Sequence, residues 1–196
     1  MPKGVYDRKI SKTRNLKYGV GTQHNVDGQG IIEVLEYIPK DIKAGVNTTR
    51  AVVKFIATGY VCNVQLSNIP AGKIKDRRKA TVYGVGYLDT DIAIPTRGSG
   101  STIRRAYDLW CNMIKRTEVE VGYEDVTVDK RWYSFKNFLN SLPELPGYDL
   151  WESTKDFHLD KDMLLGGSRE YSKNSCSFVK ASANLSDAAN RRWGNK

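Results

Sequence analysis

The chain has 196 residues, and its 31 lysines and arginines against 22 aspartates and glutamates give a formal charge of +9. This length is enough to bury a core and could hold one domain or two small ones. The basic excess favours a polyanionic partner, most commonly nucleic acid, and the alternative is a basic surface that binds nothing.

The composition argues against zinc-binding, membrane-spanning and secreted proteins. Cys62, Cys111 and Cys176 lie far apart and form no CxxC pair, which argues against a structural zinc site and predicts reduced thiols in a cytosolic compartment. No apolar run approaches the ~18 residues of a membrane span. The first 17 residues are basic but lack the apolar core of a secretory signal. We therefore expect a cytoplasmic protein that does not bind membranes.

Residues 1–29 are predicted to form a basic flexible arm. Asp7 is the only acidic residue among the first 18, against six lysines and arginines. Such an arm could lie along phosphates or remain a solvated tail.

Residues 30–95 are predicted to form a small β domain that contacts nucleic acid. Four segments have the composition of strands, at residues 31–38, 51–57, 60–66 and 81–88. Short strands separated by brief turns are typical of an antiparallel barrel or a curled sheet. Residues 89–100, with Pro95, Gly98 and Gly100, are predicted to link this domain to the next.

The loop before the fourth predicted strand is strongly basic. Its candidate phosphate contacts are Lys73, Lys75, Arg77, Arg78 and Lys79, and the alternative is an ordinary solvated loop.

Two helices are predicted next. Ser101 is a suitable N-cap for the first, along which Ile103, Tyr107, Trp110, Met113 and Ile114 recur at helical spacing and are expected to be core. Arg104 and Arg105 lie off that stripe and could bind nucleic acid. Asp129 is expected to cap a second helix that ends at residues 142–143.

Residues 157–185 are predicted to form a strand, a loop, a second strand and a helix. Asp160 would present a carboxylate from the first strand and Asn184 an amide oxygen from the helix, and hard cations such as Mg²⁺ take oxygen ligands of this kind. Asn174, in the connecting turn, could hold the loop by bonding backbone groups.

A hydrolytic site also needs a general base. Lys161 adjoins Asp160, but lysine is a poor base at neutral pH unless it is strongly desolvated. His158 is the other candidate, because alternate residues of a strand point to the same face. The alternative is a surface ion-pair cluster at residues 160–162 and an ordinary helix-surface asparagine at position 184.

Residues 101–190 resemble phage-encoded HNH (ββα-metal) endonucleases of the homing type. The matching pieces are Tyr107-Asp108-Leu109-Trp110-x-x-Met113, Val128-x-x-x-Trp132-x-x-Phe135-x-x-Phe138, Leu159-Asp160-Lys161-Asp162, Tyr171-Ser172-x-x-x-Cys176-x-Phe178-Val179 and Asn184. Residues 72–76 and 82–87 also look like the segment that precedes this module in phage relatives.

The resemblance implies an α+β protein in which residues 101–196 form the HNH-like metal module. It places Asp160 and Asn184 on the metal ligands, Asn174 near the central asparagine, and Lys161 where the family usually has its general-base histidine. The implied activity is cleavage or nicking of DNA with Mg²⁺ or another divalent cation, in the cytoplasm of a phage-infected host cell. Because Lys161 replaces the usual histidine, the alternative function is DNA binding by a nuclease-derived protein that has lost catalysis. A third hypothesis is a protein that keeps only the scaffold and binds and inhibits a host protein. The sequence leaves the oligomeric state open.

Overall fold

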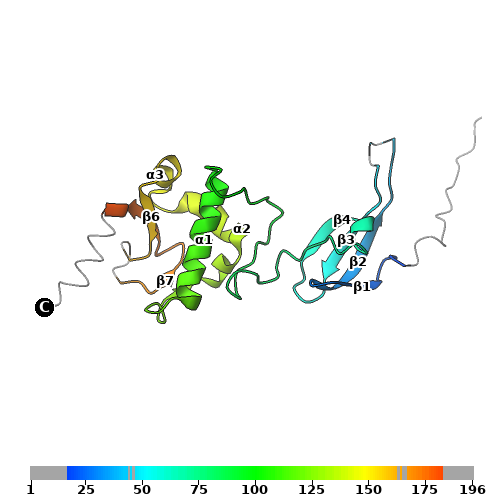
Figure 1. The fold of residues 1–196 in the computed structure, drawn as a ribbon, viewed down its shortest axis with the longest axis horizontal. Helices are drawn as coiled ribbons and strands as arrows, with labels where there is room; N and C mark the ends of the chain where they lie inside the picture. Colours follow the sequence, from blue (N-terminus) through cyan, green and yellow to red (C-terminus); the bar gives the residue numbers. More distant parts are fainter. Residues whose placement is uncertain (1–16, 44, 46, 163, 165–166, 183–196) are drawn as a thin grey trace, which may run out of the picture. The chain divides into compact units, whose positions relative to one another are not determined.

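The protein is described by a computed structural model that covers residues 17–43, 45, 47–162, 164 and 167–182. The chain divides into two compact units, Met1–Asp76 and Arg77–Lys196. Figure 1 shows the first as a small sheet and the second as helices with short strands. The expectation of an α+β protein is confirmed. In the described residues no helix is long and apolar enough to cross a membrane.

The first unit is built on an open antiparallel sheet. Its strands are β1 (Gln23–Val26), β2 (Gly30–Ile38), β3 (Arg50–Phe55) and β4 (Val61–Gln65), hydrogen-bonded in chain order. The sheet is therefore a four-stranded meander with β1 and β4 as its edges, and it does not close into a barrel. A short 3₁₀ helix, η1 (Leu66–Asn68), follows β4.

Strand β1 corrects the prediction that the first 29 residues are a flexible arm. Val26 pairs with Gly30 across a three-residue turn in which Gly28 has φ of +65°. An Asp-Gly pair next to a strand-like segment is a strong hairpin signal, because glycine accepts a positive φ at no steric cost. Residues 1–16 of the predicted arm lie outside the described residues.

Alternating side chains create the core of the first unit. Along β3, Ala51, Val53 and Phe55 are buried while the residues between them are partly exposed. Ile69 and Ile74, from the segment after β4, pack against the same face. That segment ends at buried Asp76, whose carboxylate accepts a hydrogen bond from the Thr58 hydroxyl at 2.7 Å.

Residues 81–88 do not form the predicted fourth strand. Val82 and Gly86 form an isolated bridge around a tight turn, and Val82, Val85 and Leu88 pack against the core of the second unit. A Cβ on Gly86 would lie 2.8 Å from Cδ1 of Ile114. The strand-like composition of this segment therefore serves packing against a helix. The observed division after Asp76 accordingly precedes the predicted linker.

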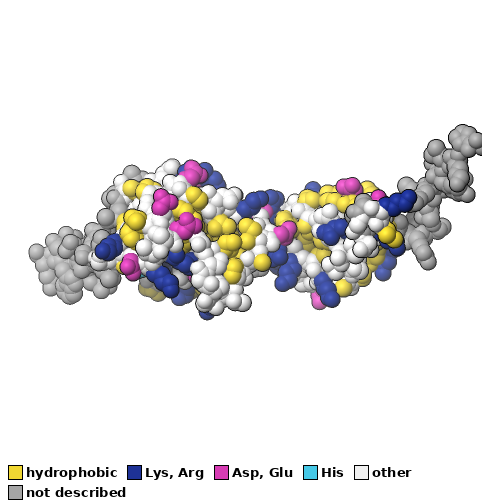
Figure 2. Space-filling model, turned by 90° about the horizontal axis from the view of Figure 1, so that it is seen from above, with side chains coloured by type: hydrophobic (Ala, Val, Ile, Leu, Met, Phe, Trp, Pro, Cys, Tyr) yellow, Lys and Arg dark blue, Asp and Glu magenta, His cyan; other side chains and the backbone are white. Residues whose placement is uncertain are grey.

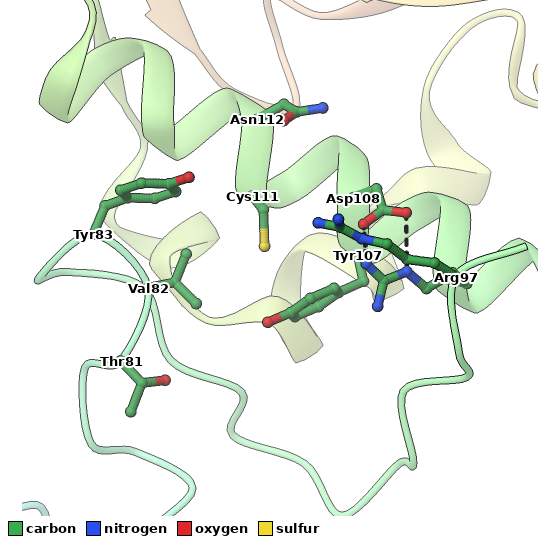
Figure 3. A pocket seen from close by; sticks show the side chains of 9 residues that line it. Thr81, Val82, Tyr83, Arg97, Tyr107, Asp108, Cys111 and Asn112 are labelled. Carbon is green, nitrogen blue, oxygen red and sulfur yellow. Dashed lines mark hydrogen bonds and ion pairs between the residues drawn. The ribbon is translucent and has the colours of Figure 1, made fainter.

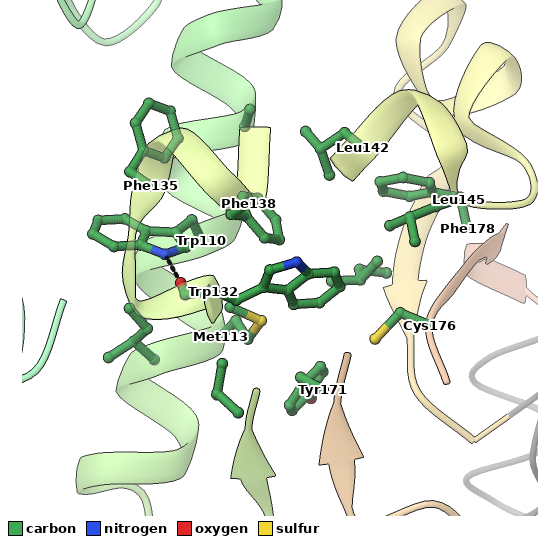
Figure 4. Close-up of a cluster of buried hydrophobic side chains, with 14 of the residues drawn as sticks. Trp110, Met113, Trp132, Phe135, Phe138, Leu142, Leu145, Tyr171, Cys176 and Phe178 are labelled. Carbon is green, nitrogen blue, oxygen red and sulfur yellow. Dashed lines mark hydrogen bonds between the residues drawn. The ribbon is translucent and has the colours of Figure 1, made fainter. Parts of the chain in front are cut away.

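Helix α1 (Thr102–Val119) organises the second unit. Ala106, Trp110, Met113 and Ile114 are its buried residues, which confirms most of the predicted stripe. Figure 4 shows Trp110 among the aromatic rings of Trp132, Phe135 and Phe138, with its indole N–H donating to the Trp132 carbonyl at 2.6 Å. Ser101 occupies the N-cap position, although its side chain makes no capping hydrogen bond.

The predicted second helix is interrupted. Asp129 caps a 3₁₀ turn, η2 (Lys130–Tyr133), and Ser134 then caps α2 (Phe135–Ser141), which is followed by η3 (Leu142–Glu144). The break arises because Tyr87 uses the backbone on both sides of Ser134: its N–H donates to the Tyr133 carbonyl and its carbonyl accepts from the Phe135 N–H. These contacts hold Ser134 in an extended conformation.

The remaining strands of the described residues form two two-stranded sheets. Strands β6 (Phe157–Asp160) and β8 (Ser177–Lys180) pair antiparallel, and β5 (Thr127–Val128) pairs parallel with β7 (Glu170–Tyr171). Helix α3 (Tyr148–Ser153) packs on β8, where the Trp151 and Phe178 rings stack with centroids 4.9 Å apart. The two residues after β8, Ala181 and Ser182, are helical.

Candidate functional site

Asp160 is the last residue of β6 and lies opposite Ser177 on β8. Its side chain is buried, with 7% of the residue exposed. The carboxylate accepts a hydrogen bond from the backbone N–H of Asp162 at 2.7 Å, which fixes the turn that leaves the strand. A carboxylate held at a strand end in this way is oriented before any ligand arrives.

Lys161, at the expected position of the general base, forms an ion pair with Asp162. Its ammonium donates to the Asp162 carboxylate at 2.7 Å, and both side chains are largely shielded from solvent. An ammonium that donates in this way has no lone pair with which to take a proton from water.

His158 lies in a different environment from Asp160, although both are on β6. It is exposed, and it lines a cavity of about 230 Å³ together with Asn112 and Arg116 of α1 and Tyr171 of β7. The structure thus brings an imidazole and a guanidinium to one hollow, a combination that could bind a phosphate and accept a proton.

The turn between β7 and β8 is held by serines. Ser175 Oγ accepts from the backbone N–H of Ser172 at 3.1 Å and donates to the Glu170 carbonyl at 2.6 Å. Asn174 is an exposed residue of this turn. The hydrogen bonds of Ser175 thus hold this turn, and the loop-holding role of Asn174 stays a prediction.

Asn184 lies outside the described residues, so its predicted convergence with Asp160 is a prediction still. Within the described part of the chain, no group of three or more His, Cys, Asp or Glu side chains is placed to hold a metal ion. No family model, curated protein or solved structure matches this chain. The resemblance to HNH endonucleases consequently depends on the residues quoted above.

Polar side chains are buried around Asp160. Of the seven buried polar residues among those described, four lie in this region: Asp160, Ser172, Ser175 and Ser177. Cys176 is fully buried beside them, and desolvation of its thiolate raises the pKa of the thiol from 9.0 to about 11. This thiol is therefore protonated at neutral pH and is not a nucleophile there.

The raised pKa of Cys176 predicts a loss of stability in alkali. Because the folded state holds the thiol proton more tightly than the unfolded state, this stabilisation is complete below about pH 9 and is lost as the pH rises through about 11. Urea unfolding at several pH values between 7 and 11 measures the decline. The decline should be shallower for Cys176→Ala, and an equally steep decline in that variant would mean that other groups cause it.

The predicted nucleic-acid contacts are divided between the two units. Lys73 and Lys75 are exposed in the first unit, and Lys79 is exposed in the second. Arg77 pairs with Asp91 at 3.5 Å and Arg78 pairs with Asp89 at 2.7 Å. On the face drawn in Figure 2, basic side chains of each unit are interspersed with apolar and uncharged ones.

The two arginines predicted on the first helix contact the protein itself. Arg104 forms a two-bond ion pair with Asp108, one turn further along α1. The guanidinium of Arg105 donates to the carbonyls of Trp151, Glu152 and Thr154 at 2.5, 3.1 and 2.7 Å. It also lies over the Trp151 ring, 4.5 Å from the centroid. Arg105 thus satisfies carbonyls at the C-terminal end of α3, where a cation is favourable.

We expect Arg105→Gln to lower the free energy of unfolding by about 2–3 kcal/mol, because charge-assisted hydrogen bonds to carbonyls and the contact with the Trp151 ring are lost together. Thermal or urea unfolding measures the change. Arg131→Gln is the matched control: this exposed arginine pairs with Asp129 two residues away, and its loss should leave stability close to wild type. If Arg105→Gln is as stable as wild type but binds DNA more weakly, Arg105 contacts DNA, as the sequence predicted.

Proposed function

We propose that the chain is an HNH-like DNA endonuclease that cleaves or nicks DNA with one divalent cation, in the cytoplasm of a phage-infected host cell. The observation that carries this proposal is the position of Asp160. It ends β6, which pairs antiparallel with β8, and β8 runs directly into the helical residues Ala181 and Ser182. This order of strand, strand and helix, with an acid at the end of the first strand, is what the resemblance implies.

The donors present are compatible with a hard cation. Asp160 offers a carboxylate oxygen, and Mg²⁺ in proteins often takes only one or two protein ligands, with water and phosphate completing its shell. Asn184 would be the second ligand in this proposal. When bound, the ion would stabilise the negative charge that develops on the scissile phosphate and on the leaving oxygen.

We assign the general base to His158 instead of Lys161. The Lys161 ammonium donates to Asp162, whereas His158 is exposed beside a cavity that also contains Arg116. A neutral imidazole has a ring nitrogen with a free lone pair, which can accept a proton from water. Arg116 would bind a non-bridging phosphate oxygen in the same hollow.

One observation favours the alternative, a nuclease-derived DNA-binding protein without chemistry. The position of the expected base is occupied by a lysine that is paired with Asp162. If His158 cannot replace it, the chain would retain salt-sensitive DNA binding and no hydrolysis.

Incubation of supercoiled plasmid with the full chain tests the two functions. The proposal expects open-circular or linear product with Mg²⁺ and none with EDTA. We further expect His158→Gln to lower the rate by roughly 10²-fold or more, the usual contribution of a general base, while Lys161→Gln keeps a rate within several-fold of wild type. DNA that is bound but uncut in Mg²⁺ and Mn²⁺ would overturn the endonuclease and support the alternative.

A further inference from the structure

A second hollow lies on the other flank of α1, and neither the HNH resemblance nor the metal site accounts for it. It has a volume of about 610 Å³ and is lined by the turn at residues 81–83, by Arg97, and by side chains of α1 that include Tyr107, Cys111 and Asn112. Figure 3 shows Tyr83 and Tyr107 projecting from these two elements, with the Cys111 thiol between them. The volume falls in the range of about 300–1,000 Å³ that is typical of small-molecule sites.

The hollow carries a net positive charge. Its charged residues are Arg97, Arg104 and Asp108. Arg104 is held by Asp108, with Nε 2.9 Å from the carboxylate, and its guanidinium lies 5.3 Å from the centroid of the Tyr107 ring. Arg97 is exposed, and within the described part of the chain no hydrogen bond or ion pair binds it. One guanidinium is therefore available to an anion.

The conformation of Tyr83 is unusual for its residue type. Its φ is +48°, in the left-handed region, and Gly84 follows with φ of +79°. The turn is closed by hydrogen bonds from Val85 N and Gly86 N to the Val82 carbonyl, at 3.2 and 2.8 Å. A bulky side chain in this region is strained, and such strain gathers at functional sites. Tyr83 is 44% exposed, so the strain is not offset by burial in the core.

We propose that this hollow binds one nucleoside phosphate unit, with its phosphate on Arg97 and its base against the Tyr83 ring. Arginine binds phosphate through two parallel hydrogen bonds, and an exposed aromatic ring stacks on any base. The Asn112 amide and the Tyr107 hydroxyl supply donors and acceptors for the edge of the base. Burial raises the pKa of Tyr107 to about 12, so that its hydroxyl keeps its proton at neutral pH.

The source of this unit is an unpaired stretch of DNA, an assignment that rests on the proposed function. Asn112 lines both this hollow and the cavity of His158 and Arg116. A strand with one nucleotide in the hollow would therefore cross α1 beside the proposed site of hydrolysis. A free nucleotide has the same chemistry, and the test separates the two sources.

Binding of a fluorescent five-nucleotide single strand, without divalent metal, tests the proposal independently of cleavage. Arg97→Gln should weaken binding roughly tenfold and reduce the slope of log K against log salt by about 0.7, the value for one phosphate contact on a single strand. Tyr83→Asn should also weaken binding roughly tenfold, through loss of stacking. Because asparagine tolerates the left-handed region, that variant should melt at or above the wild-type temperature. Arg131→Gln, outside the hollow, should bind within twofold of wild type.

Competition with dTMP and with inorganic phosphate identifies the ligand. Displacement by dTMP at lower concentration than by phosphate supports a nucleotide site, and tighter binding of the strand than of dTMP assigns the unit to a polynucleotide. Comparable binding of strand and dTMP assigns the site to a free nucleotide. Equal competition by phosphate and dTMP, or unchanged binding in both Arg97→Gln and Tyr83→Asn, would overturn the proposal. Since no step requires hydrolysis, an inactive chain that binds normally would refute the endonuclease and leave this site intact.

Discussion

Gly147→Ala is expected to destabilise the second unit by roughly 2–5 kcal/mol, a large part of the ~5–15 kcal/mol that stabilises a typical domain. Gly147 has φ of +82°, and a Cβ there would overlap the carbonyl oxygen of Phe178 on β8. The left-handed conformation costs an alanine about 1–2 kcal/mol, and relief of the overlap adds about 1–3 kcal/mol. Relief requires backbone movement, which would also strain the 2.8 Å hydrogen bond from Phe178 N to the Pro146 carbonyl.

Gly122→Ala separates these two contributions. Gly122 also has a positive φ, of +92°, but a Cβ there meets no atom within 4 Å. It should therefore cost only about 1–2 kcal/mol. Urea unfolding of both variants, followed by tryptophan fluorescence, measures the difference. Equal losses in the two variants would mean that β8 is not packed against Gly147 as described.

Asp160→Asn is expected to lower Mg²⁺-dependent plasmid nicking roughly 10²–10³-fold. The proposed ion contributes several kcal/mol to transition-state stabilisation, and each 1.36 kcal/mol is a factor of ten in rate. The substituted amide keeps an oxygen that can accept the Asp162 N–H, so the turn after β6 and the fold should persist. DNA binding without metal should stay within about threefold of wild type.

Asp156→Asn is the matched control for Asp160→Asn. It removes the same charge from an exposed residue just before β6, and its nicking rate should stay within about twofold of wild type. Equal activity of Asp160→Asn and wild type would remove Asp160 from the mechanism. Equal loss in both variants would indicate a general effect of charge on DNA binding.

The sequence predicted best where one physical signal dominates. The 3.6-residue stripe on α1 and the alternation on β3 are consequences of burial on one face, and β2 and β4 have the residue composition of strands, so these elements could be located from composition and spacing. The strand that ends at Asp160 and the strand from Ser177 were also predicted.

Long-range contacts explain why two segments differ from the secondary structure that the sequence predicts. Residues 81–88 have the composition of a strand, but Gly86 admits Ile114 and Trp110 of α1, and Tyr87 uses the backbone groups that would have continued the helix through Ser134. Neither contact leaves a local pattern. Strand β1 was not predicted because it is only four residues long and three of them, Gln23, His24 and Asn25, are polar; the Asp-Gly pair after it was its one local signal.

The candidate site was predicted in part. Asp160 at a strand end could be inferred from spacing, whereas the engagement of Lys161 by Asp162 and of Arg105 by the α3 carbonyls depends on side-chain positions that no sequence pattern reveals. The hollow at Arg97 had one local signal, a tyrosine before a glycine in a tight turn. Arg97 itself stood in a stretch that composition identified as a linker.

The most direct test of the metal proposal is Mn²⁺ titration of the ¹⁵N-labelled chain, observed by NMR. A paramagnetic ion on Asp160 should selectively broaden the amide signals of nearby residues, among them Lys161, Asp162, Cys176 and Ser177. In Asp160→Asn this broadening should vanish, while in Asp156→Asn it should persist. Broadening elsewhere in the chain, or broadening that survives Asp160→Asn, would contradict a divalent cation on Asp160 and with it the proposed nuclease.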